Sequence, residues 1–130
     1  MAGLAAVWSM IRFRLARAGG SGDHGPVNGN DELIEIGPDQ VDQHVQDGWL
    51  LLDVRTDAEW ASGRIDGSSH LPLDQLIARL DEVPDRVVCV CAVGARSAQA
   101  AVYLAAQGRQ AVNLAGGVSR WVGTGHSLTR

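Results

Sequence analysis

Residues 89–97, with the sequence CVCAVGARS, contain the side chains best suited to do chemistry. Cys91 ends an apolar run and is followed by small residues and then by Arg96 and Ser97. A thiol at such a point can act as a nucleophile when backbone N–H groups and the positive end of a helix favour its thiolate. The alternatives are an inert, buried core cysteine or one half of a Cys-x-Cys pair.

The residues after Cys91 favour the nucleophile. Small residues with one glycine let the backbone curl closely around a group that the sulfur carries. The unpaired N–H groups at the start of the following helix would then point back at the sulfur and stabilise negative charge on it. The sequence therefore predicts Cys91 as the catalytic residue, in a binding loop made of Ala92, Val93, Gly94, Ala95, Arg96 and Ser97.

Cys89 is expected to be a core residue. Along a strand, Cys89 and Cys91 would point to the same face about 6.5–7 Å apart, with parallel side-chain directions that suit a disulfide poorly. One Cys-x-Cys pair and four scattered histidines lack the spacing of zinc ligands, so no metal site is expected. His70 is a candidate base, but such a histidine is more often structural.

The elements that position this loop alternate between strands and helices. Strands are expected at residues 33–36, 49–54, 68–71, 86–91 and 111–114, and helices at 38–46, 56–61, 73–80, 95–107 and 117–122. The runs at 49–54 and 86–91 are nearly continuous in apolar residues, which is typical of strands covered on both faces. The pattern predicts an α/β fold, a three-layer sandwich with a mostly parallel central sheet flanked by helices. Asp53, Arg55 and Glu59 are expected to form a buried ion-pair network that holds the loops.

The N-terminal segments differ from the rest of the chain. Residues 1–18 combine apolar residues at helical spacing with three arginines, which indicates either an amphipathic segment with weak membrane contact or a disordered tail. Residues 19–30 are expected to be a flexible linker, and residues 31–126 the folded domain. Beyond residue 30 the chain has eight Arg and fourteen acidic residues, which argues against nucleic acid as a partner. Two cysteines on one strand favour a reducing, cytoplasmic location.

Three segments together resemble the rhodanese family of sulfurtransferases. Residues 53–72, DVRTDAEWASGRIDGSSHLP, resemble its DVR…E(Y/F/W)..GHI.GA.NIP segment. CAVGARS at 91–97 resembles its active-site loop, often C-R-x-G-x-R-S, and LAGGVSRW at 114–121 resembles its late L.GG…W segment. The resemblance runs from about residue 33 to 122 and implies a single rhodanese domain with the rhodanese-like sandwich fold.

The resemblance implies a sulfurtransferase in which Cys91 takes sulfane sulfur from a donor, holds it as a persulfide and passes it to a thiol or cyanide. No cofactor is then needed, and the donor is thiosulfate, another small sulfur donor or a persulfide-bearing protein. Ala92 stands where many members carry Arg, so weaker attraction for thiosulfate is expected. The C-x4-R spacing is shorter than the C-x5-R loop of related phosphatases, which disfavours a phosphatase. A non-catalytic, protein-binding rhodanese module remains the alternative.

Overall fold

The computed structural model describes residues 33–130, so the expectations for residues 1–18 and 19–30 lie outside the described residues. The strands are β1 (Glu35–Ile36), β2 (Leu50–Asp53), β3 (Ser69–His70), β4 (Arg86–Val90) and β5 (Gln110–Leu114). The α-helices are α2 (Val41–Gln46), α3 (Asp57–Ser62), α4 (Ala95–Ala106) and α5 (Gly117–Gly123). Three short 3-10 helices complete the fold, η2 (Pro38–Gln40), η3 (Leu73–Gln75) and η4 (Leu80–Glu82).

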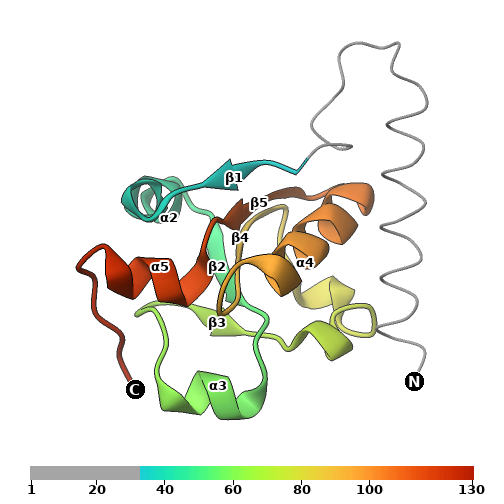
Figure 1. The fold of residues 1–130 in the computed structure, drawn as a ribbon. Helices are drawn as coiled ribbons and strands as arrows, with labels where there is room; N and C mark the ends of the chain where they lie inside the picture. Colours follow the sequence, from blue (N-terminus) through green and yellow to red (C-terminus); the bar gives the residue numbers. More distant parts are fainter. Residues whose placement is uncertain (1–32) are drawn as a thin grey trace.

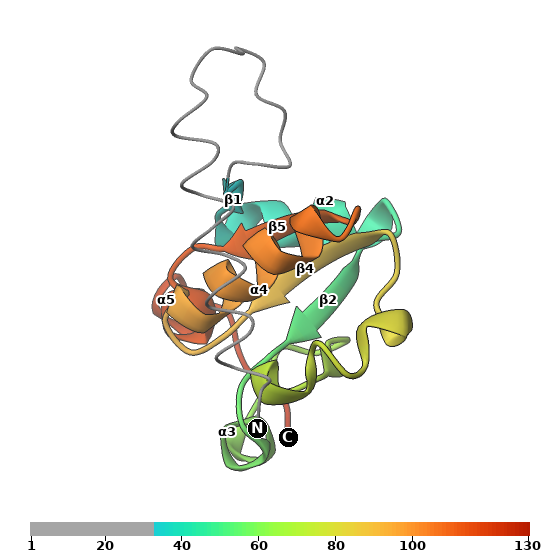
Figure 2. The ribbon, with the colours of Figure 1, turned by 90° about the vertical axis from the view of Figure 1, so that its right-hand side faces the viewer.

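The strands form one five-stranded sheet in the order β1-β5-β4-β2-β3, and every neighbouring pair is parallel. β4 lies in the middle, between β5 and β2 (Figure 2). In a parallel sheet the carboxyl ends of all strands meet at one edge, where ligands usually bind. The loops that follow β2, β3, β4 and β5 therefore converge beside Cys91.

Helices cover both faces of the sheet, with α4 on one side and α2 and α5 on the other (Figure 1). Along β4, Val87 and Cys89 pack in the core beneath α4, whereas Val88 and Val90 pack in the core beneath α5. Cys91 belongs to the same core as Cys89, so the expectation that both cysteines share a face is confirmed. Because both faces are covered, the central strands are apolar on both sides. The predicted α/β sandwich is therefore confirmed.

The prediction of a helix at residues 73–80 is wrong. The segment instead forms η3 and η4, joined by turn residues. Leu73 and Leu76 are nevertheless buried in the core, and Ile77 and Leu80 pack against it. Apolar residues three and four apart can face a core from short 3-10 turns as well as from an α-helix. A 3-10 turn also rises about 2.0 Å per residue against 1.5 Å, which suits a segment that must return along the sheet.

The chain continues past residue 126 to pair with the segment after α3. Arg64 and Thr129 form an isolated antiparallel bridge, in which each backbone N–H donates to the other residue's carbonyl, at 2.8 and 2.7 Å. Leu128 packs against the core that also contains Trp121. Within residues 33–130, no helix has the length and apolar character needed to cross a membrane.

Candidate active site

Cys91 directly follows β4, at the carboxyl edge of the sheet, and its side chain is fully buried. Its Sγ accepts a hydrogen bond from the backbone N–H of Gly94 at 3.1 Å and lies 3.2 Å from the Ser97 hydroxyl. Both donors come from the loop predicted from the sequence. The thiol therefore lies inside a turn of backbone that leads into α4, and each of these donors can stabilise negative charge on sulfur.

The loop depends on a left-handed glycine. Gly94 has φ +103° and caps the start of α4, a conformation that residues with a Cβ rarely adopt. A side chain there would also crowd the backbone of Gly116, because its Cβ would lie 3.1 Å from the Gly116 nitrogen. Val93 is 66% exposed and Ala95 is also exposed, so they form the outer rim of the loop. Ala92 is half-buried.

The start of α5 supports the cysteine loop through two backbone hydrogen bonds. The N–H of Val118 donates to the Cys91 carbonyl at 2.8 Å, and the N–H of Ser119 donates to the Ala92 carbonyl at 3.0 Å. Gly117 makes this approach possible, since a Cβ at that position would overlap the Cys91 carbonyl oxygen and lie 2.7 Å from the Ala92 carbonyl carbon. The LAGGVSRW segment thus supports the backbone of Cys91 and Ala92.

Arg96 points toward α3 and not toward the sulfur. Its guanidinium donates to both carboxylate oxygens of Glu59, at 2.7 and 2.9 Å. The hydrogen bond from Arg96, helped by those from Thr56, lowers the pKa of Glu59 to about 2 despite its partial burial. Glu59 also completes the cap of α3, where its carboxylate accepts from the Thr56 N–H at 3.0 Å. Arg96 therefore connects the loop to α3, and the Glu59 carboxylate balances the charge of its guanidinium.

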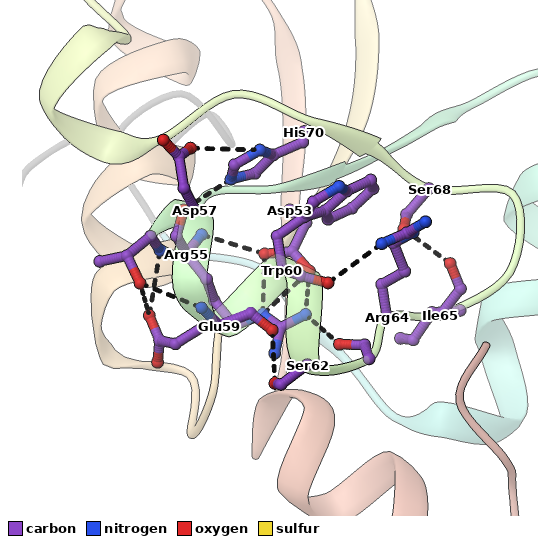
Figure 3. Close-up of polar contacts among 12 residues, drawn as sticks. Asp53, Arg55, Asp57, Glu59, Trp60, Ser62, Arg64, Ile65, Ser68 and His70 are labelled. Carbon is purple, nitrogen blue, oxygen red and sulfur yellow. Dashed lines mark hydrogen bonds and ion pairs between the residues drawn. The ribbon is translucent and has the colours of Figure 1, made fainter. Parts of the chain in front are cut away.

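A second polar cluster forms where β2 leads into α3 (Figure 3). The Arg55 Nε donates to both Asp53 carboxylate oxygens at 3.0 Å, and its Nη2 donates to the Gly63 carbonyl at 2.7 Å. Asp53 and Arg55 are both buried. The predicted ion-pair network is thus confirmed for Asp53 and Arg55, whereas Glu59 pairs with Arg96 instead.

His70 belongs to this cluster and makes no contact with Cys91. Its Nε2 lies 2.8 Å from the Arg55 carbonyl oxygen, and its ring stacks on Trp60 with centroids 4.7 Å apart. The guanidinium of Arg64 lies 4.5 Å from the centre of the Trp60 ring. These contacts hold the His70 ring within the cluster, in agreement with a structural role.

A groove of about 510 Å³ lies beside the loop. It is lined by residues 54–57 after β2, residues 72–75 after β3, and Arg96 and Gln99 of α4. Its size is typical of small-molecule sites. The groove shares Arg96 with the loop, whereas Cys91 itself is not among the residues that line it.

Sequence reasoning missed Asn113, the one polar residue in the apolar stretch of β5. Asn113 is fully buried, and its Oδ1 lies 2.5 Å from the Ser97 hydroxyl. Its Nδ2 donates to Glu35 Oε2 at 2.8 Å and to the Gly94 carbonyl at 3.2 Å. A buried amide amid Val112 and Leu114 was a usable signal, because buried polar groups need partners.

Cys89 differs from Cys91 in its surroundings. Burial, followed by the neighbouring Cys91, raises the pKa of the Cys89 thiol far above its ordinary value. Its thiolate is therefore scarce, which fits the expected core role. Both cysteines are free thiols. Among residues 33–130, no group of three or more His, Cys, Asp and Glu side chains is placed to hold a metal ion.

Comparisons with known proteins match the described fold. The Rhodanese-like domain family matches residues 37–124. A protein named Sulfurtransferase from Allochromatium vinosum is 42% identical over 92 residues, covering 67% of this chain and 86% of that protein. Thiosulfate sulfurtransferase GlpE from Ectopseudomonas mendocina is 35% identical over 103 residues, covering 75% of this chain and 93% of that protein.

Two solved structures share the fold. SSP1007 from Staphylococcus saprophyticus superposes with a TM-score of 0.66 at 30% identity, covering 75% of this chain and 100% of that chain. A rhodanese-related protein from Thermoplasma volcanium superposes with a TM-score of 0.69 at 26% identity, covering 74% of this chain and 97% of that chain. With its sheet, its cysteine loop and these matches, the chain belongs to the rhodanese-like domain family and is at family level a rhodanese-type sulfurtransferase.

Proposed function

We propose that Cys91 carries sulfane sulfur as a persulfide between a donor and a thiol or cyanide acceptor. The observation that supports this most directly is the pair of donors around Sγ, the Gly94 N–H and the Ser97 hydroxyl. They lie at the carboxyl edge of the sheet, and Arg96 of the same loop lines a groove large enough for a small substrate. The sulfurtransferase names of the relatives support the same reaction.

The reaction has two displacement steps. The Cys91 thiolate attacks the outer sulfur of the donor, and the donor's S–S bond breaks with its electron pair leaving on the donor remnant, a sulfite or a thiolate. In the second step an acceptor thiolate or cyanide attacks the outer sulfur of the Cys91 persulfide. The S–S bond breaks and returns the electron pair to Cys91 Sγ. Each cycle transfers one neutral sulfur atom, so no oxidant, reductant or cofactor is required.

The charge around the loop affects which sulfur donor the protein attracts. Arg96 is the only charged residue in the segment 91–97, and Glu59 balances it with two hydrogen bonds. Asp57 and Asp74 also line the groove. This surface offers little attraction to the dianion thiosulfate. We therefore propose a small persulfide or a persulfide-bearing protein as the preferred donor. The two free cysteines fit a reducing compartment such as the cytoplasm.

The proposal is tested by sulfur loading. The protein is incubated separately with thiosulfate and with a small organic persulfide, and its intact mass is measured before and after cyanide treatment. We expect a gain of about 32 Da that cyanide removes, faster loading from the persulfide, loading in the Cys89→Ala variant and none in Cys91→Ser. Absence of the gain with every donor would favour the alternative, a non-catalytic protein-binding module.

A further inference from the structure

A series of hydrogen-bonded polar groups runs from the buried Cys91 across the sheet to the exposed Glu35. Cys91, Ser97 and Asn113 are all fully buried. The Ser97 Oγ lies 3.2 Å from Cys91 Sγ and 2.5 Å from Asn113 Oδ1. The Asn113 Nδ2 continues the series to the carboxylate of Glu35. This series thus connects the loop between β4 and α4 with β5 and β1, and Glu35 of β1 is 78 residues from Asn113 of β5.

The partners of Asn113 determine which way its amide faces. Glu35 Oε2 and the Gly94 carbonyl oxygen, at 2.8 and 3.2 Å, can only accept hydrogen bonds. The amide nitrogen must therefore face them, because the opposite orientation would place Oδ1 against two other oxygens. Asn113 Oδ1 consequently faces Ser97 and needs a donor there, and within residues 33–130 its hydrogen-bond donor is the Ser97 hydroxyl.

Ser97 has one hydroxyl proton for several acceptors. When Cys91 is a thiol, that proton satisfies Asn113 Oδ1, and the S–H can point at the Ser97 oxygen. When the thiol loses its proton to solvent, the thiolate needs hydrogen-bond donors. The Ser97 hydroxyl can supply one only if its proton turns from Asn113 Oδ1 to Sγ. Asn113 Oδ1 is then buried without a donor, which is costly. Two acceptors therefore compete for one proton.

We propose that Asn113 is a positioning residue that competes with the Cys91 thiolate for the Ser97 proton and so limits the stabilisation that Ser97 gives to the thiolate. The inference rests on the proposed role of Cys91 and adds a control on its reactivity. Once Cys91 carries the outer sulfur, Sγ is a neutral, two-coordinate atom and needs no strong donor, so Ser97 can return to Asn113. The Ser97–Asn113 hydrogen bond thereby adds a cost to forming the free thiolate, the form most open to oxidation.

The test measures the rate at which iodoacetamide alkylates Cys91 as a function of pH, in a Cys89→Ala background that leaves one thiol. The plateau at high pH reports access to the sulfur, and the midpoint reports the stability of the thiolate. Cys89 and Arg96 are the ionisable residues near Cys91 along the chain, and Glu35 is linked to it through Asn113 and Ser97. The substitutions below leave Arg96 and Glu35 in place.

Asn113→Leu removes the competing acceptor at similar volume. We expect the midpoint to fall by about one pH unit, so that alkylation at neutral pH is about tenfold faster. Ser97→Ala should raise the midpoint, and Asn113→Leu should have no effect in the Ser97→Ala background. The inference is overturned if Asn113→Leu leaves the midpoint unchanged or raises it. It is also overturned if Asn113→Leu shifts the midpoint by the same amount in the Ser97→Ala background as in the protein that keeps Ser97.

Asn113→Asp provides a second variant that keeps the side-chain shape. Because Glu35 Oε2 and the Gly94 carbonyl both accept hydrogen bonds, one Asp oxygen must carry a proton to face them, while the other still accepts from Ser97. The midpoint should therefore stay near that of the parent, and a fall as large as that in Asn113→Leu would contradict the proposal. A merely structural role for Asn113 predicts slower reaction in both variants, opposite to the expected acceleration in Asn113→Leu. Because alkylation uses no sulfur donor, these results are independent of whether Cys91 accepts sulfur, which the loading assay with Cys91→Ser decides separately.

Discussion

Substituting Gly117 by alanine tests whether the start of α5 holds the cysteine loop in place. A Cβ at this position would overlap the Cys91 carbonyl oxygen and lie 2.7 Å from the Ala92 carbonyl carbon. Relief requires the two backbones to separate. That movement weakens the hydrogen bonds from Val118 and Ser119, which measure 2.8 and 3.0 Å.

The expected cost has two parts. The left-handed backbone of Gly117, with φ +59°, costs a residue with a Cβ about 1 kcal/mol. Losing two backbone hydrogen bonds adds about 1 kcal/mol each. Gly117→Ala should therefore lower the free energy of unfolding by about 3 kcal/mol. Gly67 provides a matched control, because it has φ +85° and no atom lies within 4 Å of the position that a Cβ would take there, so Gly67→Ala should cost only about 1 kcal/mol.

Urea unfolding followed by tryptophan fluorescence measures both variants against the parent protein. The difference of about 2 kcal/mol between them isolates the overlap with the loop from the backbone conformation. Gly117→Ala should also load sulfur on Cys91 more slowly, whereas Gly67→Ala should load it at the parent rate. If the two variants were equally stable and equally active, the start of α5 would not be the support that the geometry indicates.

Three further predictions concern the residues around the loop. The pKa of Glu59 is lowered to about 2 from 4.5, so its ion pair stabilises the fold above pH 4.5 and this contribution is lost as the pH falls toward 2. A third of the Glu59 side chain is exposed, so solvent screening reduces the effect. Glu59→Gln should lower the free energy of unfolding by about 1 kcal/mol at neutral pH, as measured by urea unfolding. The difference between variant and parent should shrink as the pH falls toward 2. Cys89→Ala should lower stability by about 1 kcal/mol while leaving sulfur transfer by Cys91 unchanged, and lost transfer would show that Cys89 takes part. Deleting residues 1–30 should leave both folding and sulfur transfer intact, and an unfolded product in circular dichroism would contradict the predicted domain boundary.

The cysteine loop was predictable because its signals are local. The apolar run of β4, the glycine at 94 and the helix start at Arg96 and Ser97 are consecutive in the chain, and each reflects a backbone requirement of its own neighbourhood. The fold class followed from the same kind of pattern, since strands covered on both faces are apolar throughout. Cys89 and Cys91 were placed on one face by strand alternation alone.

The partners of the loop were less predictable because they are tertiary contacts. Glu59 and Arg96 are 37 residues apart, and no spacing rule joins them. Asn113 and Glu35 meet only because β1 pairs with β5 at the register Glu35 to Asn113. Residues 73–80 show the opposite difficulty. Their apolar spacing suits an α-helix and two 3-10 turns equally well, and the route along the sheet selects the turns.

The central claim is that the transferred sulfur resides on Cys91. Trypsin cleavage after Arg86 and Arg96 releases residues 87–96, a peptide that contains both cysteines. Fragmentation of this peptide from sulfur-loaded protein, after alkylation to protect the persulfide, locates the additional sulfur. We expect the increment of about 32 Da on fragments that contain Cys91 and not on those that contain Cys89 alone. An increment on Cys89, or on neither residue in protein that transfers sulfur, would contradict this account.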